Sequence, residues 1–221
     1  IPMYDLILRG GTVVDGKRSQ PYAADICIRE GRIARIAPEG GEEAREVVDV
    51  SGLAVAPGFI DSHSHSDLRI IDEPLALPKI MQGITTENVG LDSMSVAPIS
   101  DKNKEPWSTS ISGLDGVAQK PWGWNGFASY LNALDAAKPS VNLSSYVGLG
   151  TVRLDVMGME DRPPTAEELR LMEESVARCM EEGARHFGGA HLHAQQVHGR
   201  TRRARQSRGP LRRHPRRAYA Q

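Results

Sequence analysis

The pattern of apolar and polar positions divides the chain into two regions. Before residue 58, short stretches alternate apolar and polar residues and are separated by glycine, as in half-buried strands joined by tight turns. The strands expected are two over 4–16 with a Gly-Gly turn between them, a hairpin over 24–38 that turns at Glu30-Gly31, and short strands over 45–58. This pattern predicts a small antiparallel β-sheet domain over residues 1–57.

From residue 54 the pattern changes to apolar strands that alternate with amphipathic helices. AVAPGFID (54–61) is a continuous apolar run, typical of a strand buried on both faces. The later elements expected are helices over 74–83, 124–139 and 164–184 and strands over 83–90 and 141–150. Alternation of this kind indicates a parallel sheet or an α/β barrel. We therefore predict an α/β fold, in which residues 58–184 form the first three strand–helix units of a partial TIM-type (β/α) barrel.

The helix over 164–184 has the clearest signals at its ends. Thr165 followed by Glu168 three residues later forms a capping-box pattern. Gly183 suits the C-terminal end. Between them, apolar residues recur with helical spacing at Leu169, Met172, Val176 and Met180.

Composition places the chain among ordinary globular proteins. It has 221 residues, of which 39% are apolar and 25% charged. No apolar run approaches the roughly 20 residues of a membrane span, so we expect no membrane association. Two cysteines, Cys27 and Cys179, do not make a disulfide framework. With no basic, signal-like N-terminus, we expect a cytoplasmic protein.

Charge is distributed unevenly along the chain. Residues 185–221 contain ten arginines and no lysine, aspartate or glutamate. The preceding 184 residues hold all 28 acidic residues and the other 17 of the 27 basic ones, a net charge of −11. An acidic body thus continues into an arginine-rich tail.

A His-x-His pair in GFIDSHSHSD (58–67) is the strongest chemical signal. Alternate side chains of a strand share one face, so His63 and His65 are expected to point the same way at the carboxyl end of the first buried strand. Catalytic groups of α/β barrels gather at that end. Imidazole is a good ligand for zinc and similar metals. The position of the pair after a long apolar run and an aspartate favours a metal site over two solvated loop histidines.

Several further segments extend the likeness to a known family. GFIDSHSHSD resembles the first-strand motif of the amidohydrolase superfamily, and the preceding GGTVVDG, GRIARI and APGFID resemble its N-terminal sheet domain. QGITTENVGLDSMSVAPI (82–99), VGLGTVR (147–153) and VMGMEDRPPTAEEL (156–169) resemble the N-acyl-D-amino-acid deacylase branch, also called the D-aminoacylases. The likeness covers residues 4–184 almost continuously.

The resemblance implies a third metal ligand. It also shows two positions at which this sequence differs from the usual residue of that branch. In that branch the segment after the second strand supplies a ligand, usually a cysteine, whereas this sequence has Asp92. A carboxylate can also bind such metals, although an exposed turn aspartate would look the same. Leu149 stands where many relatives have histidine. Asp61 and Asp67 flank the histidines and could either orient them or serve as surface caps.

By resemblance, the parent protein hydrolyses the amide bond of N-acyl-D-amino acids, which are small-molecule substrates, with zinc as one or two divalent ions. A cyclic amidase of the dihydroorotase type and a D-dipeptidase stay open as alternatives, because they share the sheet domain and the His-x-His motif. The resemblance also places the general-base aspartate and further histidine ligands beyond the end of this chain. We therefore expect the chain as given to be an inactive fragment.

The histidines of the tail, His186, His191, His193, His198 and His214, have no recognisable family setting. Read one base later with GC-rich codons, HFGGAHLHAQQVHGR (186–200) can become ISAGLIYTPSKYMDE, which resembles the family's fourth strand. In the same frame, 202–221 can become AALAKVAARYGGIHAAHMRS, which resembles a helix and the fifth strand. We therefore predict that residues 185–221 are a frame-shifted, disordered tail. A genuine nucleic-acid-binding tail on a non-catalytic fragment is the competing hypothesis.

Overall fold

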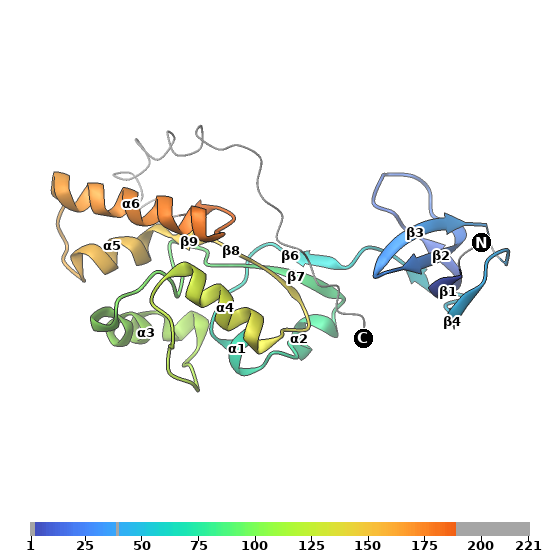
Figure 1. Cartoon of the computed structure of the whole chain (residues 1–221), viewed down its shortest axis with the longest axis horizontal. Helices are drawn as coiled ribbons and strands as arrows, with labels where there is room; N and C mark the ends of the chain where they lie inside the picture. The colour runs from blue at the N-terminus through green and yellow to red at the C-terminus, as the bar shows by residue number, and fades with distance from the viewer. Residues whose placement is uncertain (1–2, 39, 189–221) are drawn as a thin grey trace. The chain divides into compact units, whose positions relative to one another are not determined.

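The computed structural model describes residues 3–38 and 40–188 (Figure 1). They fall into two compact units, one up to Pro57 and one from Gly58. Most of the arginine-rich tail, including His191, His193, His198 and His214, lies outside the described residues. None of the described helices is long and apolar enough to cross a membrane.

The first unit is a five-stranded sheet. Its strands are β1 (Tyr4–Val13), β2 (Tyr22–Arg29), β3 (Arg32–Ala37), β4 (Ala44–Asp49) and β5 (Ala54–Val55), in the order β3-β2-β1-β4, with β5 also pairing with β1. β1–β2 and β2–β3 are antiparallel, but β4 and β5 run parallel to β1. The prediction of a purely antiparallel sheet is therefore wrong. Alternating hydrophobicity identifies strands, but it does not specify the direction of a strand's neighbour.

Glycine at the two expected turns has two different roles. Glu30 and Gly31 both have positive φ, 52° and 68°, and form the predicted hairpin turn between β2 and β3. Gly10, with φ of 76°, instead lies inside β1, where the register with β2 shifts between Leu8 and Gly11. The predicted Gly-Gly turn is therefore a β-bulge within one strand.

The second unit combines parallel strands with helices. Strands β6 (Phe59–Asp61), β7 (Ile84–Val89) and β8 (Asn142–Ser145) form a parallel sheet in that order, and β9 (Val147–Gly148) pairs in parallel with β10 (Phe187–Gly188). The helices are α1 (Arg69–Asp72), α2 (Leu77–Ile80), α3 (Asp101–Asp115), α4 (Phe127–Ala137), α5 (Leu149–Met157) and α6 (Ala166–Glu182) (Figure 1). The chain is thus a mixed α/β protein.

Two predicted elements of this unit differ from the structure. The apolar run 54–61 is divided between β5 and β6 at Pro57, which has no N–H to donate to a sheet. Among the described residues, β6 pairs with β7 alone. Its residues Phe59 and Ile60 are each 65% exposed, so it is not buried on both faces. The helix expected over 74–83 is reduced to the four residues of α2, because Pro78 is tolerated only in the first turn of a helix.

Helix α6 matches its prediction closely. The Thr165 side chain accepts a hydrogen bond from the Glu168 backbone N–H, and the Glu168 carboxylate accepts one from the Thr165 N–H. Met172 and Val176 are buried, and Gly183 follows the last turn. The predicted capping box and helix are confirmed.

Residues 185–188 join the second unit. Arg185 N donates to Ser145 O at 2.9 Å, and Val147 N donates to His186 O at 2.9 Å. These backbone hydrogen bonds align β10 with β9. The first four residues of the predicted tail are therefore ordered, because strand pairing uses backbone groups that every residue except proline offers in full.

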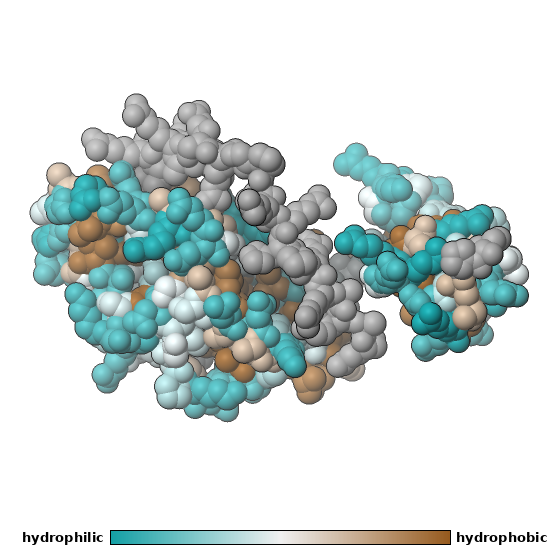
Figure 2. Space-filling view, in the orientation of Figure 1, coloured by the Kyte–Doolittle hydropathy of each residue, from teal (hydrophilic) through white to brown (hydrophobic). Residues whose placement is uncertain are grey.

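The main core of the second unit lies between its strands and helices. Its largest fully buried side chains include Phe127, Tyr130, Ile99 and Met172. On the face drawn in Figure 2, the surface is mostly hydrophilic and is interrupted by separate apolar patches. The helices and the parallel sheet thus share one core, which fixes the loops that follow β6 and β7.

Candidate metal centre

Two loops at the carboxyl ends of adjacent parallel strands carry the predicted ligands. His63 and His65 follow β6, and Asp92 follows β7. Ser64 N donates to Asn88 O at 3.1 Å, which keeps the first loop beside the end of β7. Because β6 and β7 are parallel neighbours, the two loops emerge at the same edge of the sheet.

Gly90 allows the second loop to turn toward the histidines. Its φ is +78°, and a Cβ atom there would lie 2.2 Å from the backbone oxygen of Tyr146. Asp92 and Ser93 also have positive φ, at 53° and 69°. The chain therefore bends sharply after β7 and presents the Asp92 carboxylate to the first loop.

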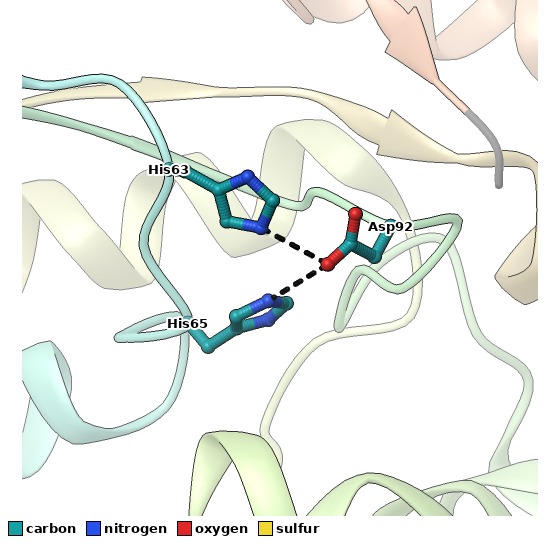
Figure 3. A group of neighbouring side chains, drawn as sticks. All are labelled: His63, His65 and Asp92. Atoms are coloured by element: carbon teal, nitrogen blue, oxygen red, sulfur yellow. Dashed lines mark hydrogen bonds and ion pairs between the residues drawn. The ribbon is translucent and has the colours of Figure 1, made fainter.

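The three side chains converge on one point (Figure 3). Asp92 Oδ2 lies 3.0 Å from His63 Nε2 and 3.3 Å from His65 Nε2. One donor atom from each residue lies within 4.8 Å of the other two. The His65 side chain is 16% exposed, whereas those of His63 and Asp92 are 56% and 47% exposed. Two imidazole nitrogens and a carboxylate oxygen form a donor set suited to zinc, with room for an exchangeable ligand.

Asp61 contacts the backbone of His63. Its Oδ1 accepts a hydrogen bond from His63 N at 3.2 Å, and its Oδ2 binds Lys79 Nζ at 2.6 Å. The hydrogen bond from Lys79 holds the pKa of Asp61 below its usual value, against the effect of burial. Asp61 thus fixes the start of the histidine loop.

Asp67 lies in the core behind the loop. Its side chain is fully buried, and within the described residues its carboxylate oxygens make no hydrogen bond to His63 or His65. Burial raises the pKa of Asp67 well above its usual value, and the negative charge of Asp115 raises it further. The structure therefore does not bring Asp67 against either imidazole ring.

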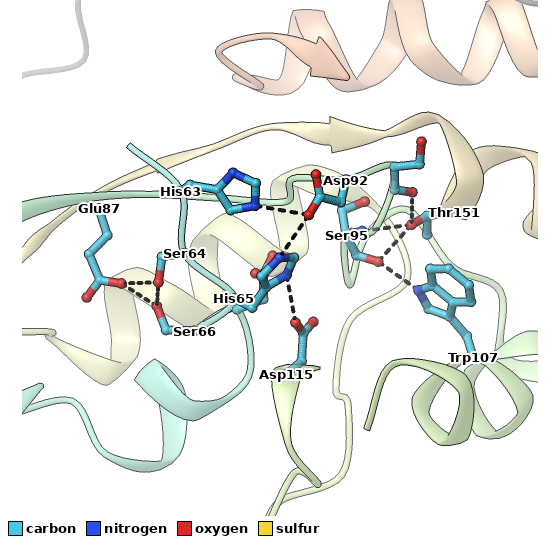
Figure 4. A network of polar contacts seen from close by, with 12 residues as sticks. His63, Ser64, His65, Ser66, Glu87, Asp92, Ser95, Trp107, Asp115 and Thr151 are labelled. Carbon is cyan, nitrogen blue, oxygen red and sulfur yellow. Dashed lines mark hydrogen bonds and ion pairs between the residues drawn. The ribbon is translucent and has the colours of Figure 1, made fainter. Parts of the chain in front are cut away.

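Asp115, which the sequence did not single out, does contact an imidazole (Figure 4). It is the last residue of α3 and is 1% exposed, and its Oδ1 lies 3.3 Å from His65 Nδ1. Burial raises the pKa of Asp115 to about 6, although the neighbouring His65 acts in the opposite direction. Its sequence context, SGLDG, carries no metal or helix signal that could have identified it.

A second polar network lies on the other side of the histidine loop (Figure 4). The hydroxyls of Ser64 and Ser66 donate to Glu87 Oε2 at 2.7 and 2.5 Å. Lys79 Nζ lies 3.3 Å from the same oxygen. Burial alone would lower the pKa of Lys79, but its hydrogen bonds and the negative charges of Asp61 and Glu87 raise it. The His-Ser-His-Ser alternation was a usable signal, because it places the serines opposite the histidines.

Comparisons with known proteins agree on one group of enzymes. The model of the amidohydrolase family matches residues 46–206. D-aminoacylase from Alcaligenes xylosoxydans xylosoxydans is 39% identical over 181 residues, which are 82% of this chain and 36% of that protein. N-acyl-D-glutamate deacylase from the same organism is 37% identical over 180 residues, 81% of this chain and 36% of that protein.

Solved structures give the same result. N-acyl-D-glutamate deacylase from Bordetella bronchiseptica, complexed with zinc and a phosphonate inhibitor, matches with a TM-score of 0.76 and 35% identity over 85% of this chain and 38% of that chain. A crystal structure of D-aminoacylase matches with a TM-score of 0.74 and 36% identity, covering 84% of this chain and 38% of that one. This chain spans little more than a third of the length of these relatives.

Proposed function

The chain belongs to the amidohydrolase family, and we propose that it is part of a metal-dependent hydrolase of the amide bond in N-acyl-D-amino acids. The observation that carries this proposal is the convergence of His63, His65 and Asp92 at the carboxyl edge of two parallel strands. Two relatives at 37–39% identity are named for action on such substrates, which supports the substrate class.

We propose that His63, His65 and Asp92 hold zinc, as one or two divalent ions. The three side chains suit a zinc ion, because the Nε2 atoms of both histidines lie close to the same oxygen of Asp92. A bound zinc ion supplies Lewis acidity, which polarises a carbonyl group and lowers the pKa of water.

The chain's own residues prepare this site. His65 must present an unprotonated Nε2, and the Asp115 carboxylate beside Nδ1 favours placing the ring proton on Nδ1. Asp61 holds the backbone at His63, and Glu87 holds Ser64 and Ser66, the residues that follow each histidine. The family resemblance places the proton-accepting aspartate later than residue 221, so we propose that this chain alone does not turn over substrate.

We also propose that the second unit is the beginning of a (β/α) barrel. The parallel pairs β6–β7, β7–β8 and β9–β10, each with helices between its two strands in sequence, support this architecture. A closed barrel needs about eight such strands.

The origin of the tail remains our proposal as well. The loss of every acidic residue and lysine after Ala184 supports a shifted reading frame. The coding DNA from codon 180 to several hundred bases past the stop should be resequenced. A one-base correction that opens a long frame with histidines and a late aspartate would support the shift. A confirmed stop without such a frame would contradict it and favour a genuine basic tail, testable by salt-dependent DNA binding.

Calorimetric titration of the full chain with zinc tests the metal centre. We expect saturable binding that is lost in His63→Ala and His65→Ala. His186→Ala is a matched control, because the ring of His186 lies beside those of Tyr146 and Phe187 and His186 is not one of the three candidate ligands. Equal zinc affinity in all four proteins would contradict the proposed site.

Activity assays test the substrate class. We expect no turnover by the chain as given, and turnover of N-acetyl-D-amino acids once the reading frame is restored. Cyclic ureides and D-dipeptides should be assayed in parallel. Preferential turnover of either would replace the proposed substrate class with a cyclic amidase or a D-dipeptidase.

A further inference from the structure

His65 lies between two carboxylates, one at each ring nitrogen (Figure 4). Its Nε2 is 3.3 Å from Asp92 Oδ2, and its Nδ1 is 3.3 Å from Asp115 Oδ1. The ring of His63 meets Asp92 through Nε2. His65 is therefore the more constrained of the two candidate ligands, and it is also the more buried.

Asp115 is held in place by the helix that carries it. Trp107 and Ile111 of α3 are buried in the main core, and Trp107 Nε1 donates to Ser95 O at 2.8 Å. Ser95 lies three residues after Asp92, so α3 is anchored to the loop that carries the third candidate ligand. The helix ends at Gly116, whose φ is +75°. Asp115 cannot move away from His65 without displacing these buried groups.

The environment of Asp115 makes the contact with His65 necessary. The Asp115 side chain is 1% exposed, and its two carboxylate oxygens and His65 Nδ1 make no aligned hydrogen bond within the described part of the chain, although Oδ1 and Nδ1 lie 3.3 Å apart. A buried carboxylate without a partner is costly. Rotation of the imidazole that aligns Nδ1–H with Oδ1 satisfies both groups.

We propose that Asp115 is a positioning residue for the metal centre. Its carboxylate accepts the Nδ1 proton of His65 and so selects the tautomer in which Nε2 carries a free lone pair. The same contact fixes the ring plane, so that this lone pair points toward the place where the donor atoms of the three candidate ligands come together. Carboxylates in this position orient ligand histidines and increase their basicity. This inference rests on the proposed function, because only a metal ion gives the free Nε2 a use, but the tautomer itself does not depend on metal.

The test uses the full chain, labelled with ¹⁵N at histidine, as wild type and as Asp115→Asn. Long-range ¹H–¹⁵N spectra of the metal-free proteins report which nitrogen of His65 carries the proton. We expect the Nδ1–H tautomer in the wild type, because Asp115 is buried, whereas the competing carboxylate of Asp92 is 47% exposed to water. Asp115→Asn should show a larger share of the Nε2–H tautomer. Competition with a chromophoric chelator should show zinc affinity about 10–100-fold lower in the variant. Asp115→Glu should recover part of the affinity.

Asp25→Asn is the matched control. Asp25 is also fully buried, but it belongs to the first unit and accepts hydrogen bonds from Arg9, Gly10 and Gly40. Its loss should leave both the His65 tautomer and the zinc affinity unchanged. A variant that only loosens the fold would lower the melting temperature without changing the tautomer.

The results separate this inference from the proposed function. Wild-type His65 in the Nε2–H tautomer would overturn the role of Asp115, even if Asp115→Asn failed to fold. An unchanged tautomer and zinc affinity in a folded Asp115→Asn would overturn it too. If the wild type bound no zinc but its His65 tautomer depended on Asp115, the orienting contact would stand and the proposed metal centre would fail.

Discussion

His63 Nε2 and Asp92 Oδ2 lie 3.0 Å apart, although 29 residues separate them in sequence. The same oxygen lies 3.3 Å from His65 Nε2, so a single carboxylate oxygen serves two imidazoles. Contact with this shared oxygen brings the two rings to the same point at the edge of the sheet. The three candidate ligands thus already lie close together in the metal-free chain.

Substitution of Asp92 should show how much of the zinc affinity depends on its negative charge and how much on the size of its side chain. Asp92→Asn keeps the size of the side chain but removes the negative charge, so we expect zinc affinity to fall at least ~100-fold, more than the loss of an outer partner costs. Asp92→Cys should retain zinc binding and bind manganese more weakly, because thiolate is a softer ligand. Calorimetry with both metals checks this. Unchanged affinity in Asp92→Asn would remove Asp92 from the ligand set.

Loss of Lys79 should destabilise the second unit. The Glu87 side chain is 0% exposed, and Lys79 Nζ lies 3.3 Å from its Oε2. Lys79→Met leaves that carboxylate buried without its counter-charge, and we expect the free energy of unfolding to fall by roughly 2–4 kcal/mol. Urea denaturation measures the change, with Lys102→Met, an exposed lysine of α3, as the control. The double variant Lys79→Met/Glu87→Gln should lose less than the single one, and a larger loss would contradict the pairing.

Gly90 should tolerate no side chain. Gly90→Ala places a Cβ 2.2 Å from Tyr146 O at a φ of +78°, so both the clash and the backbone conformation oppose it. We expect a loss of about 2 kcal/mol or more in the free energy of unfolding, together with weaker zinc binding, because the turn carries Asp92. Gly123→Ala is the control and should be nearly neutral, since a Cβ atom there would meet nothing within 4 Å in the described part of the chain. Equal stability of the two variants would show that the loop can relax.

The start of α6 should contribute a pH-dependent stability. The hydrogen bond from Arg162, followed by that from the Thr165 backbone, lowers the pKa of Glu168 from 4.5 to about 2. Because the folded-state pKa is lower than the unfolded one, the contribution is present above pH 4.5 and is lost as the pH falls toward 2. Wild type should therefore exceed Glu168→Gln in melting temperature at about pH 6, and the difference should shrink at about pH 3. A difference that grew on acidification would contradict this assignment.

The residues of the site that could be predicted are those with a signal in the neighbouring sequence. His63 and His65 were predicted from their spacing and their position directly after an expected strand. Asp92 was predicted only from the family resemblance, because an aspartate in a turn carries no metal signal of its own. Asp115 was missed because it lies at the end of α3, a helix that contains Pro106 and whose apolar pattern is weak. The contact with His65 depends on how that helix packs in the core, and no spacing rule contains this information.

The same distinction applies to the fold. Helix α6 was predictable because Thr165, Glu168 and Gly183 act within one or two turns of its ends. The parallel pairing of β4 with β1 was not predictable from the sequence, since it depends on which edge of the sheet is still unpaired when β4 joins it. Phe59 and Ile60 were expected to be buried because they are apolar, but they lie on a strand that has a neighbour on one side only among the described residues.

The separation between His63 and Asp92 also bears on the order in which the protein folds. Closing a loop of 29 residues costs only about 3 kcal/mol in chain entropy, apart from a constant term. The three donors all lie on residues that leave the ribosome before α3, although the contacts of their loops with Tyr146, Thr151 and Asp115 form only once the later segments are present. A metal ion bound there would be a short-range cross-link between two neighbouring strand ends, and it would not join distant parts of the chain.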